Sequence, residues 1–334
     1  MTIFSAPRFH DEVAAREWFE TIRWPNGPIC PRCGSGKHYA TKKPGVYRCA
    51  ASTCRKDFTV MVGTVMERSH AKFTQWAVAF HLCASSKKGF SAHQLHRTLE
   101  CKYETAWFLH HRVMEAMRTG NLDLPPMGGE GKIVEADETY FGPVKTPRTK
   151  TTKGRPYTKS GKTGNKRAIV SLVERGGKVR SFHVPRADKA TVGKIVRDNI
   201  AHESRLHTDE SNLYIAIGDL FGDHETVKHS AKEYVRGDVH TNSAEGYFSI
   251  FKRGMRGVYQ HCSEKHLHRY LAEFDFRYNH RAALGWNDEA RTIAAIRGGD
   301  SPCGRSRSKR ATHPETSIDS REPFPAPDSV SSGQ

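Results

Sequence analysis

Four cysteines near the start of the chain constrain its fold more than any other feature. Cys30 and Cys33 are separated by two residues; fifteen more lead to Cys49, and a further four to Cys54. Two short-spaced pairs around a hairpin-length insert match the tetrahedral four-thiolate site of a structural Zn²⁺. Two unrelated pairs of reduced cysteines are the alternative, and a redox pair is disfavoured because no thioredoxin-like βαβ pattern surrounds the first pair. The spacing therefore predicts a zinc ribbon over residues 26–62, a module so small that the metal must supply its folding energy.

Helical patterns flank this module on both sides. An amphipathic helix is expected within residues 1–25, where a Pro-Asn-Gly-Pro sequence then ends it. Residues 68–124 predict three helices: one that Ser69 caps, one that starts at Ser91, and one from Thr105 to Met117. Two short helices followed by a longer one, in a basic chain behind a zinc ribbon, are compatible with a helix-turn-helix DNA-binding domain. A plain three-helix bundle gives the same pattern, so both interpretations stay open.

The hydrophobic periodicity changes from helical to strand-like after a Pro- and Gly-rich linker at residues 125–129. The pattern predicts strands at 132–141, 167–174 and 178–185, a helix at 191–202, a strand ending at Asp209, a helical piece at 212–220, a strand at 225–229, and helices at 240–259 and 264–278. Three strands in a meander followed by alternating helices and strands is the order of an RNase H-like fold. The predicted fold class is therefore a multidomain chain: a small zinc ribbon, a helix-turn-helix-like helical domain, and an α/β RNase H-like domain with a mixed sheet over residues 130–290.

Three carboxylates occupy notable positions in this last domain. Asp137 and Asp209 each end a strand-like run, and 35 residues separate Asp209 from Glu245, which lies in a predicted helix. Lys252 falls two helical turns after Glu245 on the same face. A capping box between Asn242 and Glu245, or a solvated Glu–Lys ladder, is the ordinary explanation of that helix. Three carboxylates without a neighbouring Ser or Cys nucleophile instead favour Mg²⁺ or Mn²⁺ binding for phosphoryl transfer.

The sequences around these residues resemble a known family. VEADETYFG and HTNSAEGYFSIFKRG, together with the cysteine pattern, resemble the zinc-ribbon insertion-sequence DDE transposases of the ISXO-like type, from near residue 20 to near residue 285. The resemblance implies that Asp137, Asp209 and Glu245 are catalytic ligands of Mg²⁺ or Mn²⁺. It also implies that Lys252 holds a phosphate of the DNA end. Some relatives place Asn at the third position, which makes Asn242 the alternative to Glu245.

The charge of the chain indicates the same kind of partner. The formal net charge is +17, and such an excess favours a polyanion, although ribosomal, chromatin and membrane-surface proteins share it. Residues 143–166 form a basic segment without acids that leaves the strand carrying Asp137; it is predicted to be a phosphate-binding loop, with a solvated insertion as the alternative. Residues 298–334 are predicted to be a disordered tail. The predicted nucleic-acid contacts are Lys150, Lys153, Arg155, Lys252, Arg253 and Arg256.

The remaining features bear on compartment and function. The sequence shows neither an apolar run of membrane-spanning length nor a signal-peptide pattern, so a cytoplasmic protein without membrane contact is expected. The predicted function is that of a transposase, homo-oligomeric on DNA, that binds the terminal inverted repeats of its element and target DNA and catalyses two-metal-ion strand cleavage and strand transfer. A zinc-ribbon DNA-binding regulator with an inactive catalytic domain, or a metal-dependent nuclease, are the alternatives.

Overall fold

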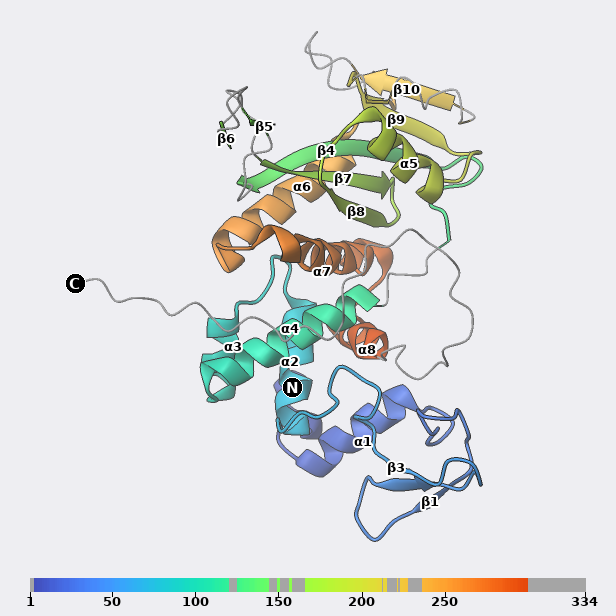
Figure 1. Cartoon of the computed structure of the whole chain (residues 1–334), viewed down its shortest axis with the longest axis vertical. Helices are drawn as coiled ribbons and strands as arrows, with labels where there is room; N and C mark the ends of the chain where they lie inside the picture. Colours follow the sequence, from blue (N-terminus) through green and yellow to red (C-terminus); the bar gives the residue numbers. More distant parts are fainter. Residues whose placement is uncertain are drawn as a thin grey trace, which may run out of the picture.

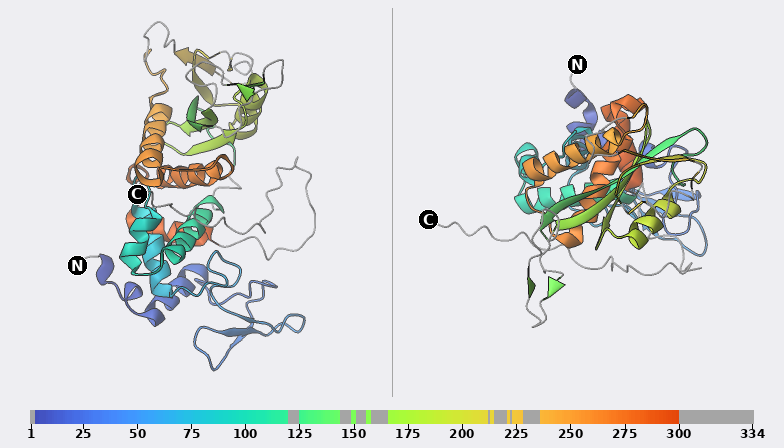
Figure 2. Two further views of the ribbon diagram at one scale, coloured as in Figure 1. Left: turned by 60° about the vertical axis from the view of Figure 1, so that its left-hand side comes forward. Right: turned by 90° about the horizontal axis from the view of Figure 1, so that it is seen from above.

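Three parts follow one another through the molecule: a small sheet, a layer of helices, and a larger sheet covered by helices (Figure 1). The left view of Figure 2 also shows the helical layer between the two sheets. The computed structural model describes residues 3–119, 125–143, 149–150, 156–157, 166–211, 213–214, 221, 223–227 and 236–299. Most of the predicted basic loop and the tail beyond 299 lie outside these residues.

The small sheet is antiparallel and belongs to the cysteine-containing module. Its strands are β1 (His38–Ala40), β2 (Tyr47–Cys49) and β3 (Asp57–Phe58), in that order. The rings of Tyr47 and Phe58 pack edge-on against Trp24, with centroids 5.9 and 5.8 Å away. Because Trp24 directly follows helix α1, this aromatic cluster attaches the ribbon to the helical layer.

The helical layer contains the predicted N-terminal helix, the three helices predicted over residues 68–124, and one further helix. Its helices are α1 (Glu12–Arg23), α2 (Phe73–Ser85), α3 (Ala92–Leu99), α4 (Tyr103–Thr119) and α8 (Asp288–Gly298). The prediction that Ser69 caps the first helix is wrong, since α2 begins after Lys72. Glu12 of α1 accepts the N–H of Phe73 at 2.7 Å and so satisfies the helix start from outside. The Ser69 hydroxyl instead accepts the indole N–H of Trp76 at 3.3 Å.

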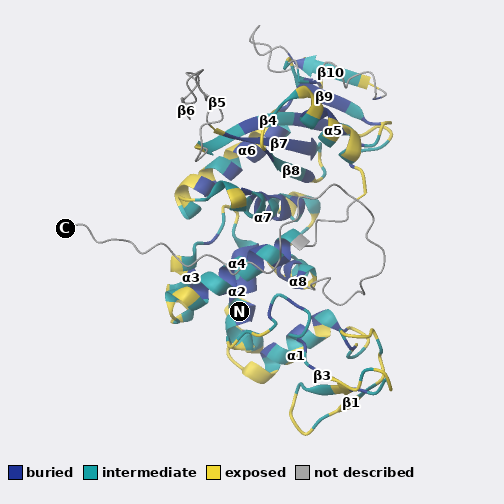
Figure 3. Cartoon of the chain, in the orientation of Figure 1, coloured by how far each residue is buried: buried dark blue, intermediate teal, exposed yellow. Residues whose placement is uncertain are grey.

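Helix α8 was not predicted. It lies near the end of the described chain and packs against helices from its beginning. His81 of α2 and Thr292 of α8 form a buried hydrogen bond of 3.2 Å. Arg8 pairs with Glu289 at 3.1 Å. Ile296 joins the hydrophobic core that α2 and α4 build, where Figure 3 shows buried residues on both helices. The helical body is therefore assembled from both ends of the sequence.

The larger sheet has five strands in the order β10-β9-β4-β7-β8. These are β4 (Ile133–Pro143), β7 (Lys166–Glu174), β8 (Val179–Val184), β9 (Arg205–Asp209) and β10 (Asp223–Val227). The first three form the predicted antiparallel meander, whereas β9 runs parallel to both β4 and β10. This order and these directions are those of an RNase H-like mixed sheet, and the predicted fold class is confirmed. A two-stranded pairing of β5 (Thr149–Lys150) with β6 (Pro156–Tyr157) lies beyond β4.

Helices cover both faces of this sheet. Helix α5 (Lys189–Asn199) packs on one face, and α6 (Asn242–Gly254) and α7 (Leu267–Asn279) pack on the other. The side chains of β7 alternate accordingly: Leu172 packs in the same core as Val196 of α5, and Ile169 in the same core as Phe251 of α6. Helix α7 also contacts α4, so it lies between the sheet and the helical body.

The helix predicted over residues 240–259 is two elements. Helix α6 starts at Asn242 and ends at Gly254, and a π-helical turn follows over Met255–Tyr259. Gly254 is confined, because a Cβ there would lie 2.4 Å from the Phe274 ring and 2.5 Å from the carbonyl oxygen of Lys88. The chain thus meets α7 and the α2–α3 connection at the point where the helical geometry changes.

Candidate active site and zinc site

The four predicted zinc ligands come together in the ribbon. The sulfur atoms of Cys30, Cys33, Cys49 and Cys54 all lie within 4.8 Å of one another, and none of the four is in a disulfide. The Sγ–Sγ distance is 3.8 Å between Cys30 and Cys54 and 3.5 Å between Cys33 and Cys49. A tetrahedron with Zn–S bonds of about 2.3 Å has edges of roughly 3.8 Å, so the four thiols fit a structural Zn²⁺.

Two of the predicted catalytic carboxylates lie side by side at the centre of the large sheet. The parallel pairing of β4 and β9 extends to Ala136 and Thr208, and the next residues of the two strands are Asp137 and Asp209. Both carboxylates therefore lie at the carboxyl end of β9, next to each other across the two strands. Asp209 also accepts the backbone N–H of Ser211 at 3.0 Å, which orients its carboxylate.

Glu138 is a third carboxylate of this cluster, and the sequence did not identify it. Alternation along β4 directs Glu138 to the face opposite Asp137. Tyr214, from the core on the α5 side, donates its hydroxyl to Glu138 Oε2 at 2.9 Å. Even so, oxygens of Asp137, Glu138 and Asp209 all lie within 4.8 Å of one another. β9 ends at Asp209, so carboxylates from the two faces can meet around the strand end.

Burial and, after it, mutual repulsion raise the pKa values of two of the clustered carboxylates. The pKa of Asp137 is raised to about 8; burial is the largest cause, and the charges of Asp209, Glu138 and Glu245 act in the same direction. The Glu138 N–H, which donates to Asp137 Oδ1 at 2.7 Å, opposes this rise. Burial and the charge of Asp209 also raise the pKa of Glu138. Crowded hard oxygen donors of this kind fit a divalent cation that would offset their charge.

Glu245 and Lys252 on helix α6 lie within electrostatic range of the cluster. Glu245 lies outside the group within 4.8 Å, but its charge contributes to the raised pKa of Asp137. Burial lowers the pKa of Lys252, and the charge of Asp137 opposes that effect, so the ammonium lies within electrostatic reach of the cluster. Arg253 and Arg256 are exposed further along the same segment. The acidic residue Glu245 therefore lies in the first turn of α6, and the cationic residues lie at and beyond its last turn.

The capping-box explanation of Glu245 is wrong. Thr241, and not Asn242, is the residue before the first turn of α6, and Asn242 is the first helical residue. Asn242 is exposed, as is Glu245. Of the predicted loop contacts, Lys150 lies in β5, where only the backbone is described, while Lys153 and Arg155 lie outside the described residues.

The strand order, the carboxylates at its centre and the four-cysteine ribbon define an RNase H-like domain behind a zinc ribbon. Residues 128–279 match the ISXO2-like transposase domain, and residues 10–57 match the transposase zinc-ribbon domain. A protein of Halobacterium salinarum described as "Uncharacterized protein in transposable element ISH50" is 30% identical over 286 residues, which cover 80% of this chain and 91% of the relative. The chain belongs to the ISXO2-like transposase family.

Two solved structures of another transposase show a distant likeness. One is the Mos1 transposase paired-end complex with left transposon end, with 13% identity, coverage of 63% of this chain and 77% of that chain, and a TM-score of 0.19. The other is a pre-cleavage Mos1 transpososome, with 11% identity, coverage of 67% and 78%, and a TM-score of 0.18.

The described helices include none that is both long and apolar enough to cross a bilayer.

Proposed function

We propose that the chain is an active DNA transposase that binds the ends of its element, cuts a DNA strand there and joins the end to target DNA. Asp137, Asp209 and Glu245 would hold two Mg²⁺ or Mn²⁺ ions, with Glu138 as an additional ligand. When bound, such ions stabilise the attacking and leaving oxygens of an in-line phosphoryl displacement. The oxygen-only donor set and the mutual repulsion of the carboxylates support a hard divalent cation over a softer metal.

The cationic residues of α6 have a separate role in this proposal. Lys252 would hold a phosphate of the terminal nucleotides against the carboxylates, because its ammonium lies within electrostatic reach of Asp137. Arg253 and Arg256 are exposed and would contact the DNA backbone, which positions the duplex without reading its sequence. The cations of the loop over residues 143–166 would add further phosphate contacts. The zinc ribbon and the helical body would hold the element end, and a homo-oligomer would pair two ends.

One observation supports the proposal most: Asp137 and Asp209 are adjacent at the end of a parallel strand pair, and the charges of Glu245 and Lys252 on helix α6 lie within electrostatic range of Asp137. A purely architectural sheet has no need to bury carboxylates whose charges oppose one another, since each raised pKa costs folding free energy. The arrangement is therefore better explained by catalysis than by a regulator that has lost its activity.

The test is cleavage and joining of DNA that carries an element end, with Mg²⁺ or Mn²⁺. Asp137→Asn keeps the size of the side chain but removes a charge that both ions need, so we expect cleavage and joining to fall by at least about a thousandfold. Lys252→Ala should reduce cleavage by less and weaken the alignment of the DNA end. End binding without added Mg²⁺ or Mn²⁺, measured by fluorescence anisotropy, should survive both changes.

Glu245→Gln distinguishes the third ligand from its alternative. We expect it to lose cleavage as Asp137→Asn does, whereas Asn242→Ala, one turn earlier on the same helix, should stay within about threefold of wild type. The opposite ranking would transfer the role to Asn242. Specific end binding by a wild-type protein that neither cuts nor joins DNA would support the regulator, and cutting without joining would support the nuclease.

A further inference from the structure

Glu135 is a fully buried carboxylate that takes no part in the cluster, although it lies only two residues from Asp137 on β4. Its Oε2 accepts the backbone N–H groups of Ser243 and Ala244 at 2.8 and 3.1 Å. Its Oε1 accepts the Ser243 hydroxyl at 3.0 Å. These groups belong to the first turn of α6, so a strand residue supplies the acceptor that the start of this helix needs.

The helix has no local substitute for this acceptor. Thr241, the residue before the first turn, makes no side-chain capping hydrogen bond. A carboxylate at a helix N-terminus is favoured both by the free N–H groups and by the helix dipole. Glu135 thus joins the strand that carries Asp137 to the helix that carries Glu245. Its contact with Ala244 is one residue before Glu245 itself.

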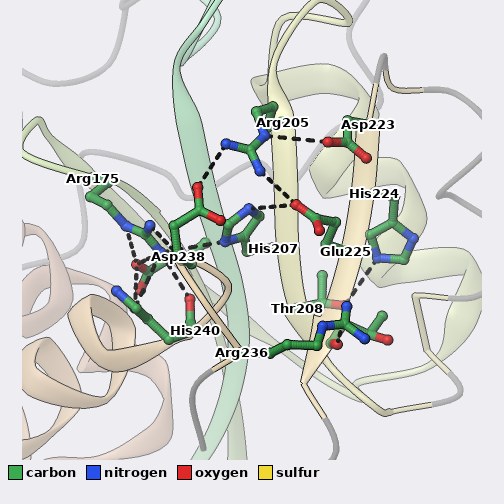
Figure 4. Close-up of polar contacts among 12 residues, drawn as sticks. Arg175, Arg205, His207, Thr208, Asp223, His224, Glu225, Arg236, Asp238 and His240 are labelled. Atoms are coloured by element: carbon green, nitrogen blue, oxygen red, sulfur yellow. Dashed lines mark hydrogen bonds and ion pairs between the residues drawn. The ribbon is translucent and has the colours of Figure 1, made fainter.

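Arg175 completes the connection from the β7–β8 turn. Its Nε and Nη2 donate to Glu135 Oε1 at 3.1 and 2.9 Å. The same guanidinium donates to the carbonyl oxygens of Asp238 and His240 at 2.7 and 3.1 Å (Figure 4). Arg175 therefore fixes the segment that leads into α6, while Glu135 fixes the first turn of the helix.

We propose that Glu135 is a positioning residue, held by Arg175, that sets the distance between the Glu245 carboxylate on α6 and the Asp137 carboxylate on β4. The inference rests on the proposed two-metal function. A metal site binds tightly when its ligands are held in place before the ion arrives. Without Glu135, the start of α6 would be free to move relative to β4, and only the metal itself would hold Glu245 beside Asp137.

The experiment compares Mn²⁺ affinity with stability in three variants of the full chain. Glu135→Gln keeps the length of the side chain but places a neutral amide against Arg175 and the helix start. We expect Mn²⁺ affinity, measured by isothermal titration without DNA, to fall about tenfold. Strand cleavage should lose kcat with little change in KM for DNA. Hydrogen exchange should quicken in the peptide that covers the first turn of α6.

The matched control is Asn279→Ala. Asn279 is also buried, and its side chain accepts the N–H of Val179 at 2.7 Å and donates to its carbonyl oxygen at 3.0 Å, so it holds α7 to β8. It should lower the melting temperature without changing Mn²⁺ affinity. Arg175→Gln is the milder variant, because Arg175 is partly exposed, and it should weaken Mn²⁺ binding by less than Glu135→Gln.

The outcomes separate the two proposals. A Glu135→Gln protein that loses stability as Asn279→Ala does but keeps wild-type Mn²⁺ affinity and kcat would overturn the positioning role. If Glu135→Gln does not fold, unchanged Mn²⁺ affinity in Arg175→Gln would overturn it equally. If Asp137→Asn and Asp209→Asn bind Mn²⁺ as wild type does, the proposed metal site itself fails, whatever Glu135 does.

Discussion

Asp137 holds a proton at neutral pH when no cation is present, because its pKa is raised to about 8. In the unfolded chain a carboxyl of ordinary pKa loses its proton near pH 4. Between these two values the folded state binds more protons than the unfolded state, so the free energy of unfolding falls as the pH rises.

We therefore expect the metal-free protein to be less stable at pH 8 than at pH 5. In Asp137→Asn this pH dependence should shrink by on the order of 2 kcal/mol, as measured by urea denaturation without added Mg²⁺ or Mn²⁺. Saturating Mg²⁺ should stabilise the wild type more at pH 8 than at pH 5, since the ion replaces the proton. Equal slopes in the two proteins would contradict the raised pKa.

Glu138 offers a second test at the scale of single residues. Glu138→Gln removes one oxygen charge from the cluster, so we expect Mn²⁺ affinity to fall about tenfold. Tyr214→Phe removes only the hydroxyl that donates to Glu138, and it should leave Mn²⁺ affinity near that of wild type while lowering stability by about 1 kcal/mol. Equal effects of the two variants would mean that Glu138 serves Tyr214 and not the metal.

The candidate site could be predicted only where a residue's role follows from its place along the chain. Asp137 and Asp209 end strand-like runs, and the spacing of Glu245 and Lys252 follows the helical repeat. Glu138 could not be found this way, because alternation along the strand assigns it to the opposite face and only the end of β9 lets it reach the others. The anchoring contacts of Glu135 join residues more than a hundred positions apart, which no local pattern records.

The ribbon is the element whose stability depends most directly on a bound ion. Cys49→Ser leaves three thiolates, and a module with so little core cannot replace the lost binding free energy. We expect stoichiometric zinc in the wild type and none in the variant by atomic absorption, with hydrogen exchange fast over β1–β3 and unchanged over β4–β9. An ordered ribbon in zinc-free protein would contradict a structural role.

Elements were predictable wherever local sequence decides them. The five strands of the large sheet and helices α2–α7 follow from periodicity, with ends shifted by a few residues. The start of α2 was misplaced because its cap comes from Glu12, 61 residues earlier. The π turn after α6 could not be predicted, because it depends on the confinement of Gly254 by α7 and the α2–α3 connection. Helix α8 was missed because its apolar side packs against helices from the other end of the described chain.

At the scale of the whole molecule, a buried ion pair connects the helical body to the larger sheet. Glu273 and Arg277 of α7 pair at 2.6 Å, and both are buried. Arg277 also donates to the carbonyl oxygens of Cys83 and Ser86 at the end of α2, at 2.8 and 2.7 Å. Tyr259, the last residue of the π turn after α6, donates its hydroxyl to Glu273 at 2.5 Å.

Arg277→Met should therefore destabilise the protein by about 3–5 kcal/mol, because Glu273 is left buried and charged without its partner. Adding Glu273→Gln should recover most of that loss. Urea denaturation followed separately by tryptophan fluorescence, which reports the helical body, and by far-ultraviolet circular dichroism should show the two parts unfolding apart in the single variant. A single variant with wild-type stability would show that the pair does not connect them.

The position of α8 has a consequence for the order in which the protein can be made. The hydrophobic core that Ile296 shares with α2 and α4 is complete only when α8 has left the ribosome. A nascent chain, or one shortened by an early stop codon, therefore lacks a closed helical body however complete its ribbon and first helices are. We expect such shortened products to be cleared and not to compete with the full-length protein for its binding sites.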